Sequence, residues 1–376
     1  GCLMKIAGIT WWRNNYGSIL QAYALQCTMN SLPNVDYEII NQFGKSITSI
    51  DNLIDKLKTI GVRKTLKRVF WKVSFRGLRN RNKRIQQFVN DKLKVSEEQY
   101  NESNIRLINQ KYDGFICGSD QIWNPRLVAL NSMYWLSFAE PDKIKISYAP
   151  SIGITQLTPK EIFAIKGSLL NFDGISCRES IGTDLINSAI GKTKCITVLD
   201  PTMLIDKCRW DDLSGERIIN EPYVFAYILK GTKQQRLCVE EFSRMFNLKI
   251  VTIPFLESEY TEWYDLRFGD IKYWAATPDE FINLVKNAEF VFTDSFHSCV
   301  YSCLYHVPFF VFPKIGHAQN TRLENLQQML QIERRNIQDF DDILRVKDKR
   351  IDWEKVDSII EAKRVVSMEY LRKHFI

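Results

Sequence analysis

The sequence predicts an α/β protein of two Rossmann-like, doubly wound domains that face a ligand cleft. Two observations predict this class. Short apolar segments of strand length alternate with longer segments of helical periodicity in both halves of the chain, and a polar region at about residues 206–221 separates the two series. The strand segments are mostly apolar throughout, as in parallel sheets covered by helices on both faces. We therefore place the first domain at residues 1–210, the second at 220–350 and a final helix at 353–376.

The first domain has alternating predicted strands and helices from its amino end onward. They are, in order, a strand at residues 4–10, a helix at 18–32, and strands at 37–42, 112–119, 143–150, 174–179 and 195–201. Thr158 and Glu161 form a capping-box pattern that begins a further helix. The loop before the first helix contains Gly17, which permits backbone amides to approach a ligand closely.

A basic helical insertion is predicted at about residues 50–94 of the first domain. Twelve Lys and Arg residues and no acidic residue lie between Lys56 and Asn90, so the rest of the chain is net acidic although the protein carries +7. Apolar residues recur at helical spacing in the same stretch, namely Leu66, Val69, Phe70 and Val73. This pattern suits an anionic membrane surface or lipid-linked substrate, and equally a solvated face whose apolar stripe packs on the domain. No nucleic-acid-binding motif accompanies the charge, so nucleic acid is not an expected partner.

The second domain resumes the alternation. Its predicted elements are a strand at residues 223–229, a helix at about 232–247, a strand at 248–254, a helix begun by Thr277 and Glu280, and a strand-helix-strand unit within 289–312. In such a unit the carboxyl end of the first strand and the start of the helix face the ligand crevice. Asp294, Ser295 and His297 lie at that junction.

His297 has structural, metal-binding and chemical interpretations. A metal site would use Cys299, Cys303 and His306 as well, but three of these ligands lie along one face of a single helix and cannot surround a tetrahedral ion. We therefore expect no metal. A histidine at a helix start also occurs as a capping or buried structural residue, the class to which we assign His306.

Composition is typical of a soluble globular protein, with 45% hydrophobic and 25% charged residues. No apolar run reaches the roughly 20 residues of a membrane span, and the amino end lacks a basic-then-apolar leader. We expect a cytoplasmic protein that the basic segment can hold at the inner face of the cytoplasmic membrane. The nine cysteines are scattered without a Cys-x-x-Cys pair, which indicates reduced thiols.

Polar residues gather in loops that follow predicted strands. The segment CGSDQIWNP places Asp120, Gln121 and Asn124 beside Trp123, a combination suited to sugar hydroxyls next to an aromatic face and also compatible with a structural turn. Arg178 follows another strand, where a guanidinium can grip a carboxylate or phosphate through two hydrogen bonds. Its alternative is an ion pair with a neighbouring acid. No Gly-x-Gly-x-x-Gly or Walker loop is present.

Six segments in this order closely resemble the polysaccharide pyruvyl transferase family: NNYGSILQAYALQ, DGFICGSDQIWNP, KISYAPSIG, ISCRES, VLDPTML and FTDSFHSCVYSCLYHVPFFVF. The resemblance extends from about Asn14 to Leu330. It implies a two-domain fold similar to the B type of glycosyltransferases. It also implies transfer of pyruvate from phosphoenolpyruvate, the donor substrate, onto two hydroxyls of one sugar, forming a cyclic ketal on a bacterial surface polysaccharide such as a capsule, or on its lipid-linked precursor. No cofactor, metal or nucleotide sugar is implied.

The resemblance also implies roles for individual residues. His297 matches the family's active-site histidine, and Arg178 matches an arginine that binds the donor. Many members carry Arg-Leu-His where this chain has Ser-Phe-His, so one cation near the donor is missing, and either Lys314 or Arg322 is a candidate to replace it. The expected donor site is Arg178, Ser295, His297, Lys314 and Arg322. The expected acceptor site is Asn15, Tyr16, Gly17, Asp120, Gln121, Trp123 and Asn124.

The expected chemistry assigns three catalytic residues. Protonation of the methylene carbon of phosphoenolpyruvate opens C2 to a sugar hydroxyl, after which phosphate leaves and a second hydroxyl closes the ketal. Arg178 is the expected cation, His297 the proton carrier or phosphate partner, and Asp120 the group that orients or deprotonates the acceptor. Three alternatives stay open: enolpyruvyl transfer that stops at the vinyl ether, a glycosyltransferase of the same fold class that uses a nucleotide sugar, and a non-catalytic carbohydrate-binding protein.

Overall fold

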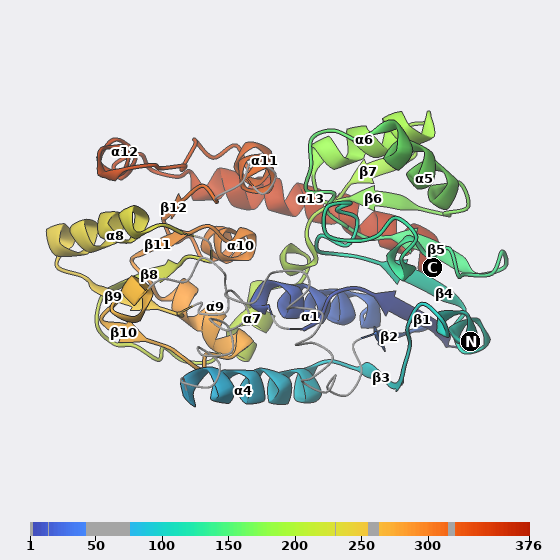
Figure 1. Ribbon diagram of the computed structural model, residues 1–376, viewed down its shortest axis with the longest axis horizontal. Helices are drawn as coiled ribbons and strands as arrows, with labels where there is room; N and C mark the ends of the chain where they lie inside the picture. The colour runs from blue at the N-terminus through green and yellow to red at the C-terminus, as the bar shows by residue number, and fades with distance from the viewer. Residues whose placement is uncertain (1–2, 14, 43–75, 230, 255–262, 315–319) are drawn as a thin grey trace. The chain divides into compact units, whose positions relative to one another are not determined.

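The structure is a computed structural model of the 376-residue chain, and it describes all residues except 1–2, 14, 43–75, 230, 255–262 and 315–319 (Figure 1). The chain divides into two compact units. The first unit comprises Gly1–Gly44, Val89–Asp206 and Asp357–Ile376, and the second comprises Lys45–Phe88 and Lys207–Val356. Each unit contains a parallel five-stranded sheet of its own.

The sheet of the first unit has the strand order β3-β2-β1-β4-β5, with all pairs parallel (Figure 1). Its strands are β1 (Met4–Ile9), β2 (Val35–Asn41), β3 (Val95–Gln99), β4 (Gly114–Cys117) and β5 (Ile144–Ser147). A separate parallel pair consists of β6 (Ile175–Cys177) and β7 (Cys195–Thr197). The order reverses between β1 and β4, and such a switch point is where open α/β sheets bind ligands.

The helices of the first unit include the two that the sequence predicts, at residues 18–32 and after Thr158. They are α1 (Tyr16–Asn30), α5 (Pro159–Leu169) and α6 (Ser180–Ile190), with short 3₁₀ turns η1 (Ile105–Gln110), η2 (Met133–Trp135) and η3 (Pro201–Met203). Asn15 caps α1 by accepting a hydrogen bond from the Gly17 amide at 2.8 Å. The predicted capping box of α5 is confirmed, with the Thr158 amide 2.7 Å from Glu161 Oε2.

The second unit repeats the same plan with strand order β10-β9-β8-β11-β12. Its strands are β8 (Tyr223–Tyr227), β9 (Lys249–Thr252), β10 (Ile271–Lys272), β11 (Phe290–Thr293) and β12 (Phe309–Val311). Its helices are α7 (Lys207–Ser214), α8 (Lys233–Phe246), α9 (Pro278–Lys286), α10 (Phe296–Leu304), α11 (Thr321–Met329) and α12 (Phe340–Val346), with the 3₁₀ turn η4 (Trp263–Leu266). The predicted strand-helix-strand unit is therefore confirmed as β11-α10-β12. The core of the second unit is aromatic, and Phe242 packs edge-on against Phe292 and Phe310.

The carboxyl-terminal helix α13 (Trp353–Phe375) packs at each end on a different set of elements. Near its start, the Trp353 ring stacks on the His306 ring with centroids 5.2 Å apart. His306 is exposed and follows the end of α10, so it is neither the helix-capping nor the buried histidine that was expected. Further along, Tyr370 Oη donates to the Ser147 carbonyl at 2.8 Å, and Ser367 Oγ accepts from the Leu199 amide at 3.0 Å. These later residues belong to the first unit.

Helix α4 (Arg76–Lys92) corrects the interpretation of the basic insertion. The buried Arg81 donates to the Trp274 carbonyl at 2.7 Å and to the Pro254 carbonyl. Arg84 forms a two-point ion pair with Glu280, at 2.8 and 3.1 Å. These two arginines therefore make internal contacts of the second unit, to which residues 76–88 belong, rather than belonging to an insertion in the first domain.

For the rest of the basic segment, both a membrane-binding surface and a solvated face stay possible interpretations. Arg79 and Lys83 on α4 are exposed. The apolar stripe from Leu66 to Val73 lies outside the described residues. Within the described residues, no helix is long and apolar enough to cross a membrane, and none of the eight described cysteines forms a disulfide.

Candidate active site

The switch point of the first sheet is held together by a glutamine that the sequence analysis did not select. Gln21 on α1 donates from Nε2 to Thr10 Oγ1, just after β1, at 3.0 Å, and to the Ser18 carbonyl at 2.8 Å. Its Oε1 accepts from the amide of Ser119, just after β4, at 3.0 Å. Gln21 thus fixes the carboxyl ends of β1 and β4 next to each other. The sequence signal that could have identified it is a polar residue on the buried face of a predicted helix.

Asp120 lies at this switch point, as expected. It has a φ of 64° and is 7% exposed. A non-glycine residue in the left-handed region carries backbone strain, and such residues cluster at functional sites. One carboxylate oxygen accepts from Ser18 Oγ and the other from the Gln121 amide at 2.9 Å, while the Asp120 carbonyl accepts from the Ser151 amide at 2.7 Å. Its carboxylate is therefore fixed in direction at the carboxyl edge of the sheet.

Arg178 is buried in an ion-pair network rather than exposed at its strand end. Its side chain is 2% exposed, and Nη1 donates to Asp200 Oδ2 at 2.9 Å while Nε lies 3.4 Å from Glu179 Oε1. Asp200 is fully buried and also accepts from Ser119 Oγ at 3.3 Å and from the Thr202 amide at 3.0 Å. The loops after β4, β6 and β7 are joined through this network.

The charges around Arg178 are mainly negative. Burial by itself lowers the pKa of Arg178, but the carboxylates of Glu179, Asp200 and Asp120 together raise it above its ordinary value. Arg178 therefore stays charged, and the ion-pair alternative named from the sequence describes its contacts. The negative charges of the three acids offset the positive charge of Arg178, which weakens its attraction for an anionic donor.

Trp123 corrects the expected acceptor site. It is fully buried, stacks on Trp135 with ring centroids 4.9 Å apart, and donates from its indole nitrogen to the Tyr134 carbonyl at 3.0 Å. Its ring therefore belongs to the core of the first unit and presents no face to a sugar. The sequence pattern misled because an aromatic residue in a polar loop has the same local signature whether it points inward or outward.

The other expected acceptor residues have structural contacts as well. Asn124 Nδ2 donates to Gln121 Oε1 at 3.1 Å, and Asn124 Oδ1 accepts from the Arg126 amide at 3.0 Å, as in a structural turn. Tyr16 and Gly17 are buried in the first turn of α1. Asn15 is exposed, with its side chain committed to capping that helix. Of the acceptor set, Asp120 has the geometry best suited to chemistry.

His297 lies close to the carboxyl ends of the strands of the second unit. Asp294, after β11, is buried and its Oδ1 accepts from the Leu229 amide, after β8, at 2.8 Å. Ser295 caps α10, with Oγ 3.4 Å from the Ser298 amide. His297 lies in the first turn of this helix, 6% exposed and edge-on to the Phe296 ring at 5.2 Å. The positive end of the helix dipole favours an anion at this position.

Three cations of the second unit are candidates to replace the arginine missing before His297. Lys314 follows β12 and lines a cavity of about 700 Å³. Arg322 is buried on α11. Arg236, which the sequence analysis did not select, is buried on α8 and paired with Asp265. Burial lowers the pKa of Arg236, while Asp265 and then Asp294 oppose this, which places Arg236 in the electrostatic environment of the β11 strand end.

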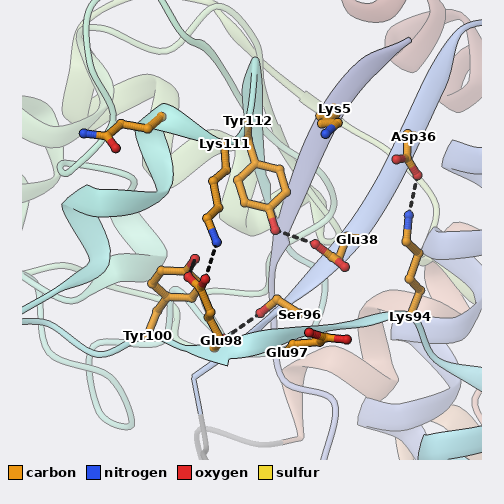
Figure 2. Close-up of a pocket in the computed structure, with 11 residues that line it drawn as sticks. Lys5, Asp36, Glu38, Lys94, Ser96, Glu97, Glu98, Tyr100, Lys111 and Tyr112 are labelled. Atoms are coloured by element: carbon orange, nitrogen blue, oxygen red, sulfur yellow. Dashed lines mark hydrogen bonds and ion pairs between the residues drawn. The ribbon is translucent and has the colours of Figure 1, made fainter.

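A separate charged hollow of about 580 Å³ is lined by residues of β1, β2 and β3 and of the segment that precedes β4 (Figure 2). Figure 2 shows several of its side chains in contact, namely Lys94 with Asp36 at 2.5 Å, Tyr112 with Glu38 at 2.5 Å and Lys111 with Glu98 at 2.6 Å. Its lining includes Lys5 and Asp36 near the amino ends of β1 and β2, and Glu98 and Tyr100 at the carboxyl end of β3. We assign it no ligand.

No metal site is evident in the described part of the chain. It contains no group of three or more His, Cys, Asp or Glu side chains placed to hold an ion. That activity needs no metal stays a prediction.

Comparison with protein families identifies one match. The sequence model of the polysaccharide pyruvyl transferase family matches residues 15–313. This range includes Asp120, Arg178 and His297. No curated protein matches the chain.

Solved structures resemble the chain in fold. A UDP-GlcNAc 2-epimerase from Neisseria meningitidis bound to UDP-GlcNAc has a TM-score of 0.53 at 9% identity, covering 98% of this chain and 100% of that one. The trehalose-6-phosphate phosphatase N-terminal domain from Candida albicans has a TM-score of 0.51 at 10% identity, covering 99% and 96%. A putative UDP-N-acetylglucosamine 2-epimerase from Listeria monocytogenes has a TM-score of 0.50 at 9% identity, covering 100% and 97%. At such identities the likeness shows fold alone, and it confirms the expected α/β class of two Rossmann-like units similar to the glycosyltransferase B fold.

Proposed function

Because the chain belongs to the polysaccharide pyruvyl transferase family, we propose that it moves pyruvate from phosphoenolpyruvate onto two hydroxyls of one sugar and forms a cyclic ketal. The observation that carries this proposal is the family match over residues 15–313, which contains a strained, fully hydrogen-bonded aspartate at the switch point of the first unit and a histidine at the corresponding position of the second. Phosphoenolpyruvate serves as donor substrate, without a cofactor or a metal.

In the first unit, Asp120 is the proposed base. Ser18 and the Gln121 amide hold its carboxylate in direction, and a carboxylate so fixed can orient a sugar hydroxyl and take its proton as the hydroxyl attacks C2. Arg178 is the proposed cation for the donor. Its contact with Asp200 at 2.9 Å fixes the guanidinium, so the charge is placed before the donor arrives.

In the second unit, His297 is the proposed proton carrier or phosphate partner. A histidine changes charge near neutral pH, and the first turn of α10 supplies backbone amides and a positive dipole end for an anion. Ser295, the cap of that helix, is a proposed donor contact. Lys314, Arg322 and Arg236 are the candidates for the additional cation.

The proposed acceptor is a sugar of a bacterial surface polysaccharide, such as a capsule, or of its lipid-linked precursor. Phosphoenolpyruvate is a cytoplasmic metabolite, so the reaction belongs at the inner face of the cytoplasmic membrane. Within α4, the exposed Arg79 and Lys83 are the described residues that support attraction to an anionic surface.

The test is incubation of the pure protein with phosphoenolpyruvate and a panel of free and lipid-linked sugars, following phosphate release. The proposal predicts release that depends on the acceptor. His297→Gln should lower turnover at least about 10²-fold, because general acid–base catalysis contributes about 10²–10⁴-fold. His306→Gln, at a histidine that stacks on Trp353, is the matched control and should keep near-native turnover.

Product analysis separates the alternatives. A ketal and a vinyl ether add the same mass to the sugar, so proton NMR is needed to distinguish a ketal methyl group from vinyl protons. A glycosyltransferase would bind a nucleotide sugar and ignore phosphoenolpyruvate. A carbohydrate-binding protein would bind glycan and release no phosphate, and either result would overturn the proposal.

A further inference from the structure

Two adjacent tryptophans follow β1, and they differ in how much of each is covered by protein. Trp12 is 5% exposed, and its indole nitrogen donates to the Ile40 carbonyl at 3.1 Å, so it is a core residue. Trp11 is half-buried. Strand ends of this kind are where open α/β sheets bind ligands. Of the two side chains, Trp11 is therefore the one that has aromatic surface left for a ligand.

The position of the Trp11 ring is well defined. Part of the side chain packs against the core of the first unit, and the ring lies edge-on to the Tyr134 ring, with centroids 6.4 Å apart and planes at 89°. The Trp11 carbonyl accepts from Gln21 Nε2 at 2.8 Å, which fixes the backbone as well. A ligand that stacks on this ring meets a surface that is already ordered, so little entropy is lost by the protein on binding.

Direct contacts place Trp11 close to Asp120, the proposed base. Gln21, whose Nε2 bonds the Trp11 carbonyl, accepts at Oε1 from the Ser119 amide at 3.0 Å. Thr10 Oγ1 donates to the Ser119 carbonyl at 3.3 Å. The residues that immediately precede Trp11 and Asp120 are therefore in contact with each other, and the two loops lie side by side at the switch point of the sheet.

Tyr134 supplies a hydroxyl beside the Trp11 ring. Its Oη accepts from Gln42 Nε2, just after β2, at 3.3 Å, and no acceptor for the hydroxyl proton is present in the described part of the chain. Burial raises the pKa of Tyr134 above its ordinary value, and hydrogen bonds from Gln42 and Trp11 offset only part of this rise. The charge of Asp120 also raises it, so the carboxylate is within electrostatic reach of the hydroxyl. The protonated hydroxyl can donate to a ligand oxygen near Asp120.

An aromatic ring, a hydroxyl donor and a carboxylate together match the surface of a pyranose. The C–H groups on one face of a pyranose pack well on an aromatic ring, whereas its hydroxyls surround the ring edge. With that face on Trp11, one edge hydroxyl can accept from Tyr134 while a second meets the Asp120 carboxylate. A phosphorylated or carboxylated ligand fits less well, because the negative charge of Asp120 repels it.

We propose that Trp11 is the platform on which the acceptor sugar stacks and that Tyr134 Oη orients one of the two hydroxyls that form the ketal, an inference that rests on the proposed function. The ligand is a neutral pyranose with an uninterrupted C–H patch on one ring face. Trp11 takes the role that the sequence had assigned to the buried Trp123. Stacking is the same before and during the reaction, so these contacts act on acceptor affinity rather than on the chemical step.

The kinetic test compares Trp11→Ala, Trp11→Phe and Tyr134→Phe, with Phe163→Ala as matched control. Phe163 is 82% exposed on α5, so the control removes an aromatic side chain from a surface with no proposed ligand. Trp11→Ala should raise the acceptor KM at least about 10-fold, and Trp11→Phe less than about 3-fold, because a smaller ring still stacks. Tyr134→Phe should raise it about 3- to 10-fold through loss of one hydrogen bond. The KM for phosphoenolpyruvate should stay unchanged in all four variants.

A binding measurement tests the same subsite without turnover. The probes are the methyl glycosides of glucose, galactose and mannose, observed by saturation-transfer NMR. We expect saturation of the C–H protons on one ring face of at least one probe with the wild type and with Phe163→Ala. Trp11→Ala should abolish this transfer.

An acceptor KM of Trp11→Ala within 2-fold of the wild type would overturn the platform, and an equal rise in the KM for phosphoenolpyruvate would assign Trp11 a structural role instead. If Trp11→Ala does not fold, Tyr134→Phe decides, and an unchanged acceptor KM in that variant overturns the inference. If the wild type releases no phosphate from phosphoenolpyruvate, the proposed function has failed, but the NMR measurement still reports on the subsite. No saturation of any probe by the wild type, or the same saturation by Trp11→Ala, would then refute it.

Discussion

Replacing Asp200 with Asn would test the ion pair that orders the strand ends of the first unit. Asn keeps the shape but presents an amide or a neutral oxygen where Oδ2 accepts from Arg178 at 2.9 Å and from Ser119 at 3.3 Å. Removing one partner of a buried ion pair costs about 3–5 kcal/mol, because the other charge stays buried. The remaining contact of Arg178 with Glu179 offsets part of this, so we expect a loss of about 2–4 kcal/mol in the free energy of unfolding.

Urea unfolding followed by tryptophan fluorescence measures this loss, because the buried Trp123 and Trp135 report on the core of the same unit. Asp184→Asn, an exposed position on α6, is the matched control and should change stability by less than about 0.5 kcal/mol. Adding Arg178→Met to Asp200→Asn should restore part of the loss, because the unpaired charge is removed with its partner.

A loss below about 1 kcal/mol in Asp200→Asn with an unchanged urea dependence would contradict the ion-pair account. So would a double variant whose loss equals the sum of the two single losses, since independent sites are additive.

Four further predictions follow from individual contacts. Arg81→Gln should destabilise the second unit by about 1–3 kcal/mol in thermal or urea unfolding, because buried carbonyls lose their donor, and an unchanged stability would contradict this. Arg79→Gln with Lys83→Gln should leave stability unchanged but weaken sedimentation with anionic vesicles at low salt, and binding indifferent to lipid charge would oppose a membrane role. Activity should survive EDTA, and loss with recovery on Mg²⁺ or Zn²⁺ would refute metal-free catalysis. Partial burial, and then the charge of Lys373, lower the pKa of His374 below 6.5. Stability should therefore fall as pH drops below about 6.5, because the unfolded chain then takes up a proton that the folded chain resists. Unfolding measured across pH should show a weaker dependence for His374→Gln.

Local patterns were enough to predict many of the helices and strands. The capping box at Thr158 and the strand-helix-strand unit at residues 289–312 depend on neighbours a few positions apart, and both are confirmed. The placement of Asp120 and His297 at strand ends was predicted for the same reason, since the carboxyl ends of parallel strands can be read from the alternation.

Contacts between distant segments could not be predicted. Arg178 and Asp200 are 22 residues apart, and Arg81 bonds to a carbonyl 193 residues away. Periodicity shows that a residue is buried but does not identify its partner, so the ion pair was one alternative among several and the internal role of Arg81 was missed. The prediction that Trp123 lines the acceptor site was wrong for the same reason, because the ring packs on Trp135 in the core of the unit.

The most direct measurement is proton and carbon NMR of the product formed from phosphoenolpyruvate labelled with ¹³C at its methylene carbon. The proposed function predicts one labelled methyl signal on a quaternary ketal carbon attached to the sugar, with one phosphate released per ketal formed. A labelled vinyl signal would show transfer that stops at the enol ether. A label that remains in phosphoenolpyruvate with every sugar offered would contradict pyruvyl transfer by this chain.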